Sequence, residues 1–175
     1  MIHFNNLIKD KELEKASENL PNEVHVIGYV ENSKHNKNYN FVLIGRNAEN
    51  QIKVEDIIYF KFEDSTKYAN RIDAISYYSR DYMDNFCLYL DKIPNHIQYI
   101  DLYLMRDGDC NVLLEHMLRF QSRWNEDLFT YYTVTSGEHC NLLCGTFAKV
   151  SDGWKFYPKF AEHSINFDKL DIFYH

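Results

Sequence analysis

The sequence predicts a mostly β protein, an antiparallel β-sandwich of two sheets with few short helices. Aromatic residues make up 16% of the chain, and most are Tyr and Phe, which favour the pleated, half-buried surfaces of sheets. Short apolar runs separated by polar turns recur at regular intervals, a pattern typical of a sandwich. Asp152-Gly153 lies between two alternating apolar runs and predicts a tight hairpin, because glycine tolerates positive φ.

The chain before the first strand predicts a short polar helix over residues 10–20, which Asp10 can cap and Pro21 ends. Strands are then predicted, in chain order, at Val24–Val30, Tyr39–Gly45, Ile57–Phe62, Ala74–Tyr78, Phe86–Leu90, Ile97–Met105, Leu128–Thr135, Leu142–Val150 and Trp154–Phe160.

The segment Leu114–Trp124 fits two interpretations. Alternation of His116, Leu118 and Phe120 with polar or flexible neighbours favours a strand. A helix with Met117 and Phe120 on one face is the alternative, because both periods can be read in so short a segment.

Length and charge narrow the classes of function. A chain of 175 residues is most simply one domain, residues 1–175. The formal charge of −7 argues against nucleic acid and against anionic lipid as partners, because both need clustered basic residues. Residues 1–10 lack the basic and apolar regions of a signal peptide, so we expect a cytoplasmic location.

The four cysteines, Cys87, Cys110, Cys140 and Cys144, are spread along the chain, and without an export signal we expect reduced, metal-free thiols. Zinc held by Cys140 and Cys144 with Cys110 and His116 is the alternative. Burial as small hydrophobes is the simpler interpretation.

No pattern of residues indicates catalysis. Cys87 and Cys140 could act as nucleophiles, with His96, His116 or His163 as a base, but no local signature links any two of them. Glycine-rich phosphate loops do not occur in a chain with 6 Gly. We therefore expect a protein that is not an enzyme.

Three motifs of the chain occur in an order that matches a known family: the apolar run Val24–Gly28, then Leu90-Asp-Lys-Ile-Pro94, then Gly153-Trp-Lys-Phe156. They resemble, in turn, the first core strand ending in glycine, the entry to a later core strand and the C-terminal hairpin of the TerD-like (tellurium resistance and stress response) family. The resemblance implies a β-sandwich and calcium binding by acidic loops at one end.

Carried over to this chain, the resemblance implies a degenerate calcium site. Its metal ligands would be Glu31, Asn38, Asn40, Asp81, Asp84 and Asn85. Amides stand at positions 38 and 40 where the family has carboxylates, and the second loop is shortened and holds Arg80. Calcium needs roughly six to eight oxygen ligands, so we expect calcium binding that is weak or absent. Solvated turn residues are the plainer interpretation of this set.

The leading functional hypothesis is a cytoplasmic binding module of the stress or tellurium-resistance type. The alternative is a protein-interaction factor, a scaffold or inhibitor acting for instance in phage–host conflict, that uses the same fold without metal. An aromatic cluster of Tyr77, Tyr78, Tyr82 and Trp124 is a candidate surface for a protein partner. Cross-strand packing is the competing and favoured interpretation of that cluster.

Overall fold

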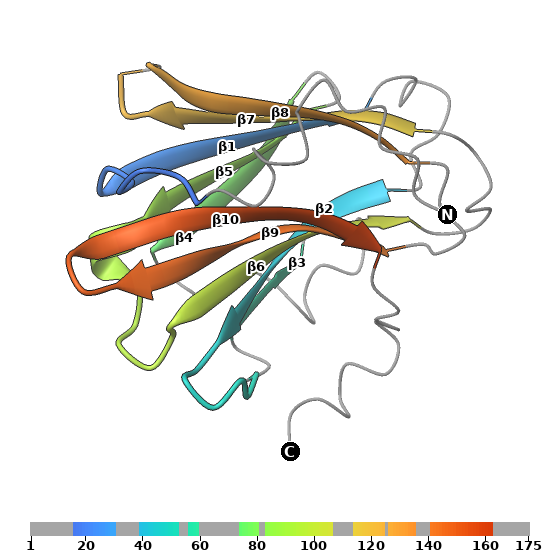
Figure 1. Cartoon of the computed structure of the whole chain (residues 1–175). Coiled ribbons are helices and arrows are strands. Elements are labelled where there is room, and N and C mark those ends of the chain that lie inside the picture. The colour runs from blue at the N-terminus through green and yellow to red at the C-terminus, as the bar shows by residue number, and fades with distance from the viewer. Residues whose placement is uncertain are drawn as a thin grey trace.

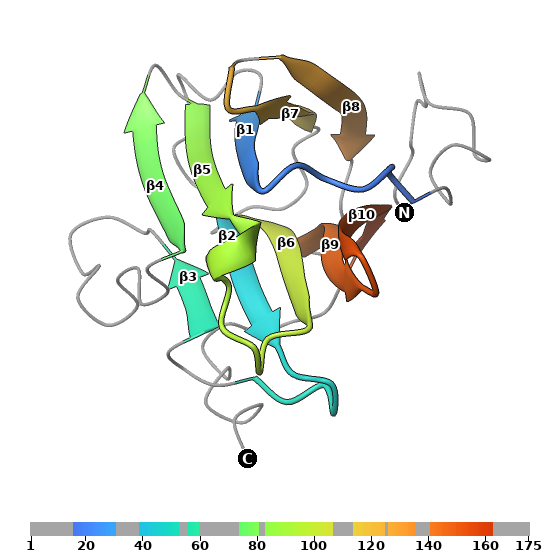
Figure 2. The same ribbon diagram turned by 90° about the vertical axis from the view of Figure 1, so that its left-hand side faces the viewer.

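Two five-stranded antiparallel sheets pack face to face in the computed structural model of the chain (Figure 1). Sheet A has the strand order β4-β5-β1-β7-β8, and sheet B has the order β10-β9-β6-β2-β3. Figure 2, turned by 90°, shows the two layers from another side. The residues that the structure describes are 16–30, 39–52, 56–59, 74–80, 83–106, 114–124, 126–135 and 141–162.

The elements are β1 (Glu23–Val30), β2 (Tyr39–Arg46), β3 (Ile57–Tyr59), β4 (Ile75–Arg80), β5 (Met83–Tyr89), the 3-10 turn η3 (Leu90–Lys92), β6 (Tyr99–Arg106), β7 (Leu114–Ser122), β8 (Asp127–Thr135), β9 (Asn141–Val150) and β10 (Gly153–Glu162). The predicted fold class is confirmed, and each predicted strand is present, although residues 60–62 of the third lie outside the described part. The ambiguous segment is β7, a strand paired with β1 on one side and β8 on the other.

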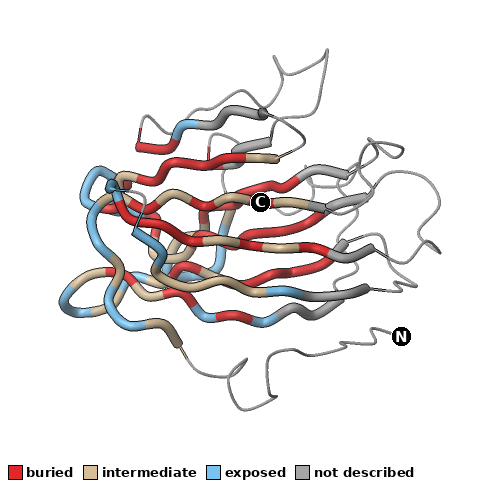
Figure 3. Tube along the Cα trace, turned by 90° about the horizontal axis from the view of Figure 1, so that it is seen from above, coloured by how far each residue is buried: buried red, intermediate tan, exposed pale blue. Residues whose placement is uncertain are grey.

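Alternate side chains of both sheets meet in one apolar core, and Figure 3 shows the buried residues running along the strands. Phe120 of sheet A lies 4.6 Å from Phe156 and 5.9 Å from Phe147 of sheet B, measured between ring centroids. Trp154 and Phe156 are buried whereas Lys155 between them is partly exposed, as the alternation predicted. Aromatic contacts between the sheets therefore form part of a core that is otherwise mostly aliphatic.

Gly28 marks a close approach of the two sheets. A Cβ atom at this position would lie 2.4 Å from the ring of Phe41, which belongs to sheet B. Any larger residue here would push the Phe41 ring out of the core, so the packing itself requires glycine.

The predicted hairpin between β9 and β10 is confirmed. Val150 pairs with Gly153, and Ser151 and Asp152 form the turn between them. Gly153 has a φ of 146°, a conformation that favours glycine.

The helix predicted over residues 10–20 is wrong for residues 16–20, and residues 10–15 lie outside the described part. Residues 17–20 instead run along the edge of sheet B: Ser17 N–H donates to the Phe156 carbonyl and Leu20 N–H to the Trp154 carbonyl, each at 2.8 Å. Strand β10 would otherwise leave these carbonyls unpaired at the sheet edge. Leu20 also packs on the core, so tertiary contacts override a weak local helix preference.

Among the described residues, no helix is long and apolar enough to cross a membrane.

Candidate functional site

Three chemically reactive side chains gather on the outer face of sheet A. In β1, Val24 and Val26 point into the core, so Glu23 and His25 point the other way. Antiparallel pairing with β5 sets His25 opposite Cys87. The strand register, rather than a loop, therefore brings the carboxylate, the imidazole and the thiol together.

The donor atoms of these three side chains lie close to one another. His25 Nε2 is 2.9 Å from Glu23 Oε1 and 3.7 Å from Cys87 Sγ, and that sulfur is 4.0 Å from Glu23 Oε1. In the described part of the chain, this is the only group of three His, Cys, Asp or Glu side chains whose ligand atoms lie within 4.8 Å of one another. The Glu23–His25–Cys87 cluster is therefore the candidate site.

Electrostatics keep the thiol of the cluster protonated. Burial raises the pKa of Cys87 above its ordinary value of 9.0, and the negative charge of Glu23 raises it further. Hydrogen bonds with the Tyr89 and Ser76 side chains oppose this rise in pKa without cancelling it. At neutral pH the sulfur is a thiol, which is a poor nucleophile.

The cluster also lacks the geometry of a Cys–His–acid triad. In such a triad the acid holds one imidazole nitrogen and the nucleophile faces the other. Here Glu23 and Cys87 both approach Nε2 of His25. The arrangement fits binding better than nucleophilic catalysis.

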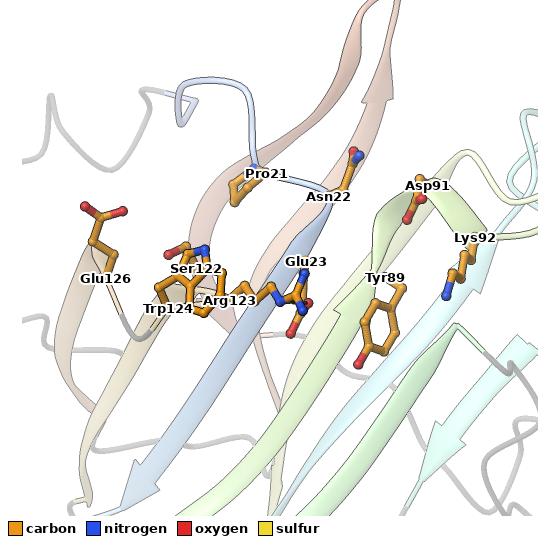
Figure 4. A pocket seen from close by; sticks show the side chains of 10 residues that line it. All are labelled: Pro21, Asn22, Glu23, Tyr89, Asp91, Lys92, Ser122, Arg123, Trp124 and Glu126. Atoms are coloured by element: carbon orange, nitrogen blue, oxygen red, sulfur yellow. Dashed lines mark ion pairs between the residues drawn. The ribbon is translucent and has the colours of Figure 1, made fainter.

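A groove of about 460 Å³ adjoins the cluster at the end of sheet A (Figure 4). Its lining comes from the start of β1, the end of β5, η3 and the β7–β8 turn, and includes Glu23, Tyr89, Asp91, Lys92, Arg123 and Trp124. Arg123 Nε lies 3.8 Å from Glu23 Oε2, and its guanidinium stacks 5.1 Å from the centre of the Trp124 ring. Trp124 is nevertheless 78% exposed, so the groove presents one large aromatic side chain to solvent.

No protein-family model matches the sequence, and neither does any curated protein. The solved structures that share its architecture include SAV2460 and SCO6318. SAV2460, described as a protein of unknown function, is 11% identical with a TM-score of 0.57, over 85% of this chain and 94% of its own. SCO6318 from Streptomyces coelicolor A3(2), described as a homologue of telluride resistance protein (TerD), is 12% identical with a TM-score of 0.54, over 84% of this chain and 93% of its own.

The chain has a TerD-like fold.

Of the residues that the TerD-like resemblance implied as calcium ligands, three lie in described strands. Asn40 is in β2 of sheet B, and Asp84 and Asn85 are in β5 of sheet A. Asn85 is buried and donates from Nδ2 to the Met83 carbonyl at 3.3 Å. Residues Glu31, Asn38 and Asp81 lie outside the described part, so the calcium site stays a prediction.

Two other predicted groups of residues are only partly described. Cys144 is a free thiol buried in the core, and burial raises its pKa. His116 lies on the opposite sheet from Cys144, and Cys110 and Cys140 are outside the described residues.

The predicted aromatic cluster is also only partly described. Trp124 is exposed, so the core-packing interpretation is wrong for this residue. Tyr82 lies outside the described part, and only the backbone of Tyr77 and Tyr78, in β4, is described.

The sequence interpretation missed the Glu23–His25–Cys87 cluster. Alternation in the first strand could have placed Glu23 and His25 on one outward face. Their partner Cys87 follows only from the pairing of β1 with β5, a strand far away in the sequence.

Proposed function

We propose that this chain is a non-enzymatic, cytoplasmic binding module that holds a protein partner in the groove at the end of sheet A. The observation that carries the proposal is Trp124, 78% exposed beside Arg123. Tryptophan, tyrosine and arginine supply most of the binding energy at protein interfaces, and Tyr89 lines the same groove. A large exposed aromatic side chain stacked with an arginine at the edge of a groove fits a recognition role.

The charges of the groove favour a basic partner. Lys92 stacks over the Tyr89 ring at 4.9 Å and Arg123 over Trp124, so both cations already have aromatic partners. The carboxylate of Asp91 forms no ion pair within the described part of the chain. With a net charge of −7, the whole molecule would also steer a positively charged surface toward it.

The fold supports a role of the stress or tellurium-resistance type. SCO6318, which shares the fold, is described as a homologue of telluride resistance protein. The protonated Cys87 thiol and the shared Nε2 contact support binding over catalysis. Calcium, on this proposal, contributes weakly or not at all, because amides replace carboxylates at Asn38 and Asn40.

Capture of partners by a Trp124→Ala variant tests the proposal. The matched control is Tyr157→Ala, which removes an aromatic residue that is 42% exposed in β10 of the other sheet. Both variants should keep the wild-type denaturation midpoint, because neither side chain is buried. We expect a basic protein to be retained by wild type and by Tyr157→Ala, lost with Trp124→Ala, and weakened by salt.

Retention of the same partner by Trp124→Ala, or capture of acidic proteins only, would contradict the proposal. The identity of a partner that depends on Trp124 also separates the two functional classes. A product of the same resistance system supports the stress module, whereas a phage or host-defence protein supports a scaffold or inhibitor in phage–host conflict.

A further inference from the structure

The outer face of sheet A carries a second binding feature beside the groove, with Glu23 common to both. Glu23 and His25 are two residues apart on β1, and Cys87 is the direct cross-strand partner of His25. Their side chains offer a carboxylate oxygen, an imidazole nitrogen and a sulfur, three different ligand atoms of the kinds that zinc accepts. Strands hold these positions more rigidly than loops would.

The distances between the three atoms fit a tetrahedral metal centre. Zinc bonds of about 2.0–2.3 Å at tetrahedral angles place neighbouring ligand atoms roughly 3.3–3.6 Å apart. The observed separations are 2.9 Å for oxygen to nitrogen, 3.7 Å for nitrogen to sulfur and 4.0 Å for oxygen to sulfur. Each differs from the tetrahedral value by about 0.5 Å or less, which small rotations about the side-chain torsions can supply.

We propose that Glu23, His25 and Cys87 form a zinc-binding site with an open fourth position. A thiolate and an imidazole together select zinc or a similar transition metal, whereas calcium and magnesium take oxygen ligands. The site is therefore chemically distinct from the predicted calcium loops. It also replaces, for Cys87, the expectation of a metal-free thiol.

The ion has access to the site, and the surroundings can support it. The side chains of Glu23 and His25 are 21% and 28% exposed, so the ion can enter from solvent. Ser76 is the cross-strand partner of Cys87 on β4, and Tyr89 lies two residues along β5 on the same face, so both hydroxyls can act as outer-shell partners of the metal site. Glu23 and Tyr89 also line the groove, so the open position can take water or a donor from a molecule bound there.

Binding requires a defined movement of protons. A proton on His25 Nε2 can donate to Glu23 Oε1 at 2.9 Å when the ion is absent. To bind zinc, Nε2 must offer its lone pair, so the imidazole proton lies on Nδ1. The Cys87 thiol releases its proton to solvent as the zinc–sulfur bond forms, so one zinc ion displaces that proton without any oxidation or reduction.

The test uses the full chain without an affinity tag, treated with a chelator and then titrated with zinc alone or cobalt alone. We expect one zinc ion per chain, a higher melting temperature with zinc, and a thiolate-to-cobalt charge-transfer band. Cys87→Ser and His25→Ala should each lower zinc affinity by at least the roughly 10- to 100-fold that loss of an outer-shell partner costs. Cys87→Ser should also abolish the charge-transfer band.

Matched controls come from the same chain. His96→Gln changes a histidine that pairs with Asp56 at 2.8 Å, outside the cluster, and Cys144→Ala removes a core thiol; both should retain wild-type zinc affinity. If a substitution of Cys87 unfolds the chain, Glu23→Gln still tests the site, because this variant on the outer face should fold like wild type. A charge-transfer band that persists in Cys87→Ser, zinc affinity unchanged in both His25→Ala and Glu23→Gln, or no stoichiometric zinc would each overturn the proposal.

Discussion

The outer faces of the two sheets each carry a carboxylate, Asp101 on sheet B and Glu23 on sheet A, and the two have different partners. Asp101 is buried and Glu23 is partly buried. On sheet B, Arg46 forms two hydrogen bonds with Asp101, at 2.5 and 3.0 Å, and the Thr146 hydroxyl donates a third at 2.6 Å. On sheet A, Glu23 faces His25 and Cys87, and its cationic neighbour Arg123 stays 3.8 Å away with its side chain 68% exposed.

The difference between the two clusters separates a structural role from a binding role. Asp101 already accepts three hydrogen bonds, two from a guanidinium and one from a hydroxyl, which indicates a structural role. Few protons are available for hydrogen bonds among the ligand atoms of Glu23, His25 and Cys87. A cation placed between these three atoms would accept a lone pair from each of them. Cross-strand pairing builds both clusters, but of the two only the cluster on sheet A brings together three side chains that could each bind a metal ion.

The largest expected effect lies in the core that both sheets share. Trp154 is 5% exposed, so Trp154→Ala should lower the free energy of unfolding by about 3–5 kcal/mol, the range for deleting a large buried aromatic side chain. Chemical denaturation measures the change, with the exposed Tyr157→Ala on the same strand as control. An unchanged midpoint for Trp154→Ala would show that the sheets are not held together at this residue.

The next largest effect compares the two carboxylates directly. Asp101→Ala removes the carboxylate to which Arg46 and Thr146 donate and should cost about 1.5–3 kcal/mol, the range for hydrogen bonds to charged groups. Glu23→Gln should cost less than about 1 kcal/mol, because the ion pair of Glu23 with the exposed Arg123 side chain contributes little. Denaturation of both variants in chelator checks this order. Equal losses of unfolding free energy would mean that the cluster on sheet A contributes as much to stability as the cluster on sheet B.

The sequence predicted the strands well, because apolar alternation depends on local residues such as Val24, Val26 and Trp154-Lys-Phe156. Residues 16–20 could not be predicted in the same way, since their hydrogen bonds are made to Phe156 and Trp154, far along the chain. The cluster of Glu23, His25 and Cys87 could not be predicted for the same reason: it depends on the pairing of β5 with β1.

A third effect is the pH dependence of the stability that Asp127, next to the groove residue Glu126, gives to the fold. Hydrogen bonds from Arg119 and then Gln121 lower the pKa of Asp127 from its ordinary value of 3.8 to about 2. Because the folded pKa is the lower one, this stabilisation is present above pH 3.8 and is lost as the pH falls toward about 2. Unfolding free energies measured against pH should therefore differ between wild type and Asp127→Asn above that window and converge below it. A constant difference down to pH 2 would assign the effect to something other than this carboxylate.

The smallest effect expected is that of calcium. The predicted loops hold two amides and Arg80 in place of a full set of carboxylates, so calcium should bind in the millimolar range or not at all, as poorly charged sites do, on the order of 10⁻⁴–10⁻³ M. The melting temperature at micromolar calcium should equal that in chelator, for wild type and for Asp84→Ala. A large rise in wild type that Asp81→Ala or Asp84→Ala abolishes would restore calcium binding as the main function.

Anomalous diffraction at the zinc edge, from crystals of the chelator-treated chain soaked in zinc, tests the contrast between the two outer faces most directly. It locates the ion without relying on affinity or stability. We predict an anomalous peak between Glu23 Oε1, His25 Nε2 and Cys87 Sγ, and no peak beside Asp101. Zinc bound elsewhere, with no peak at the cluster on sheet A, would contradict the assignment of that face as the binding face.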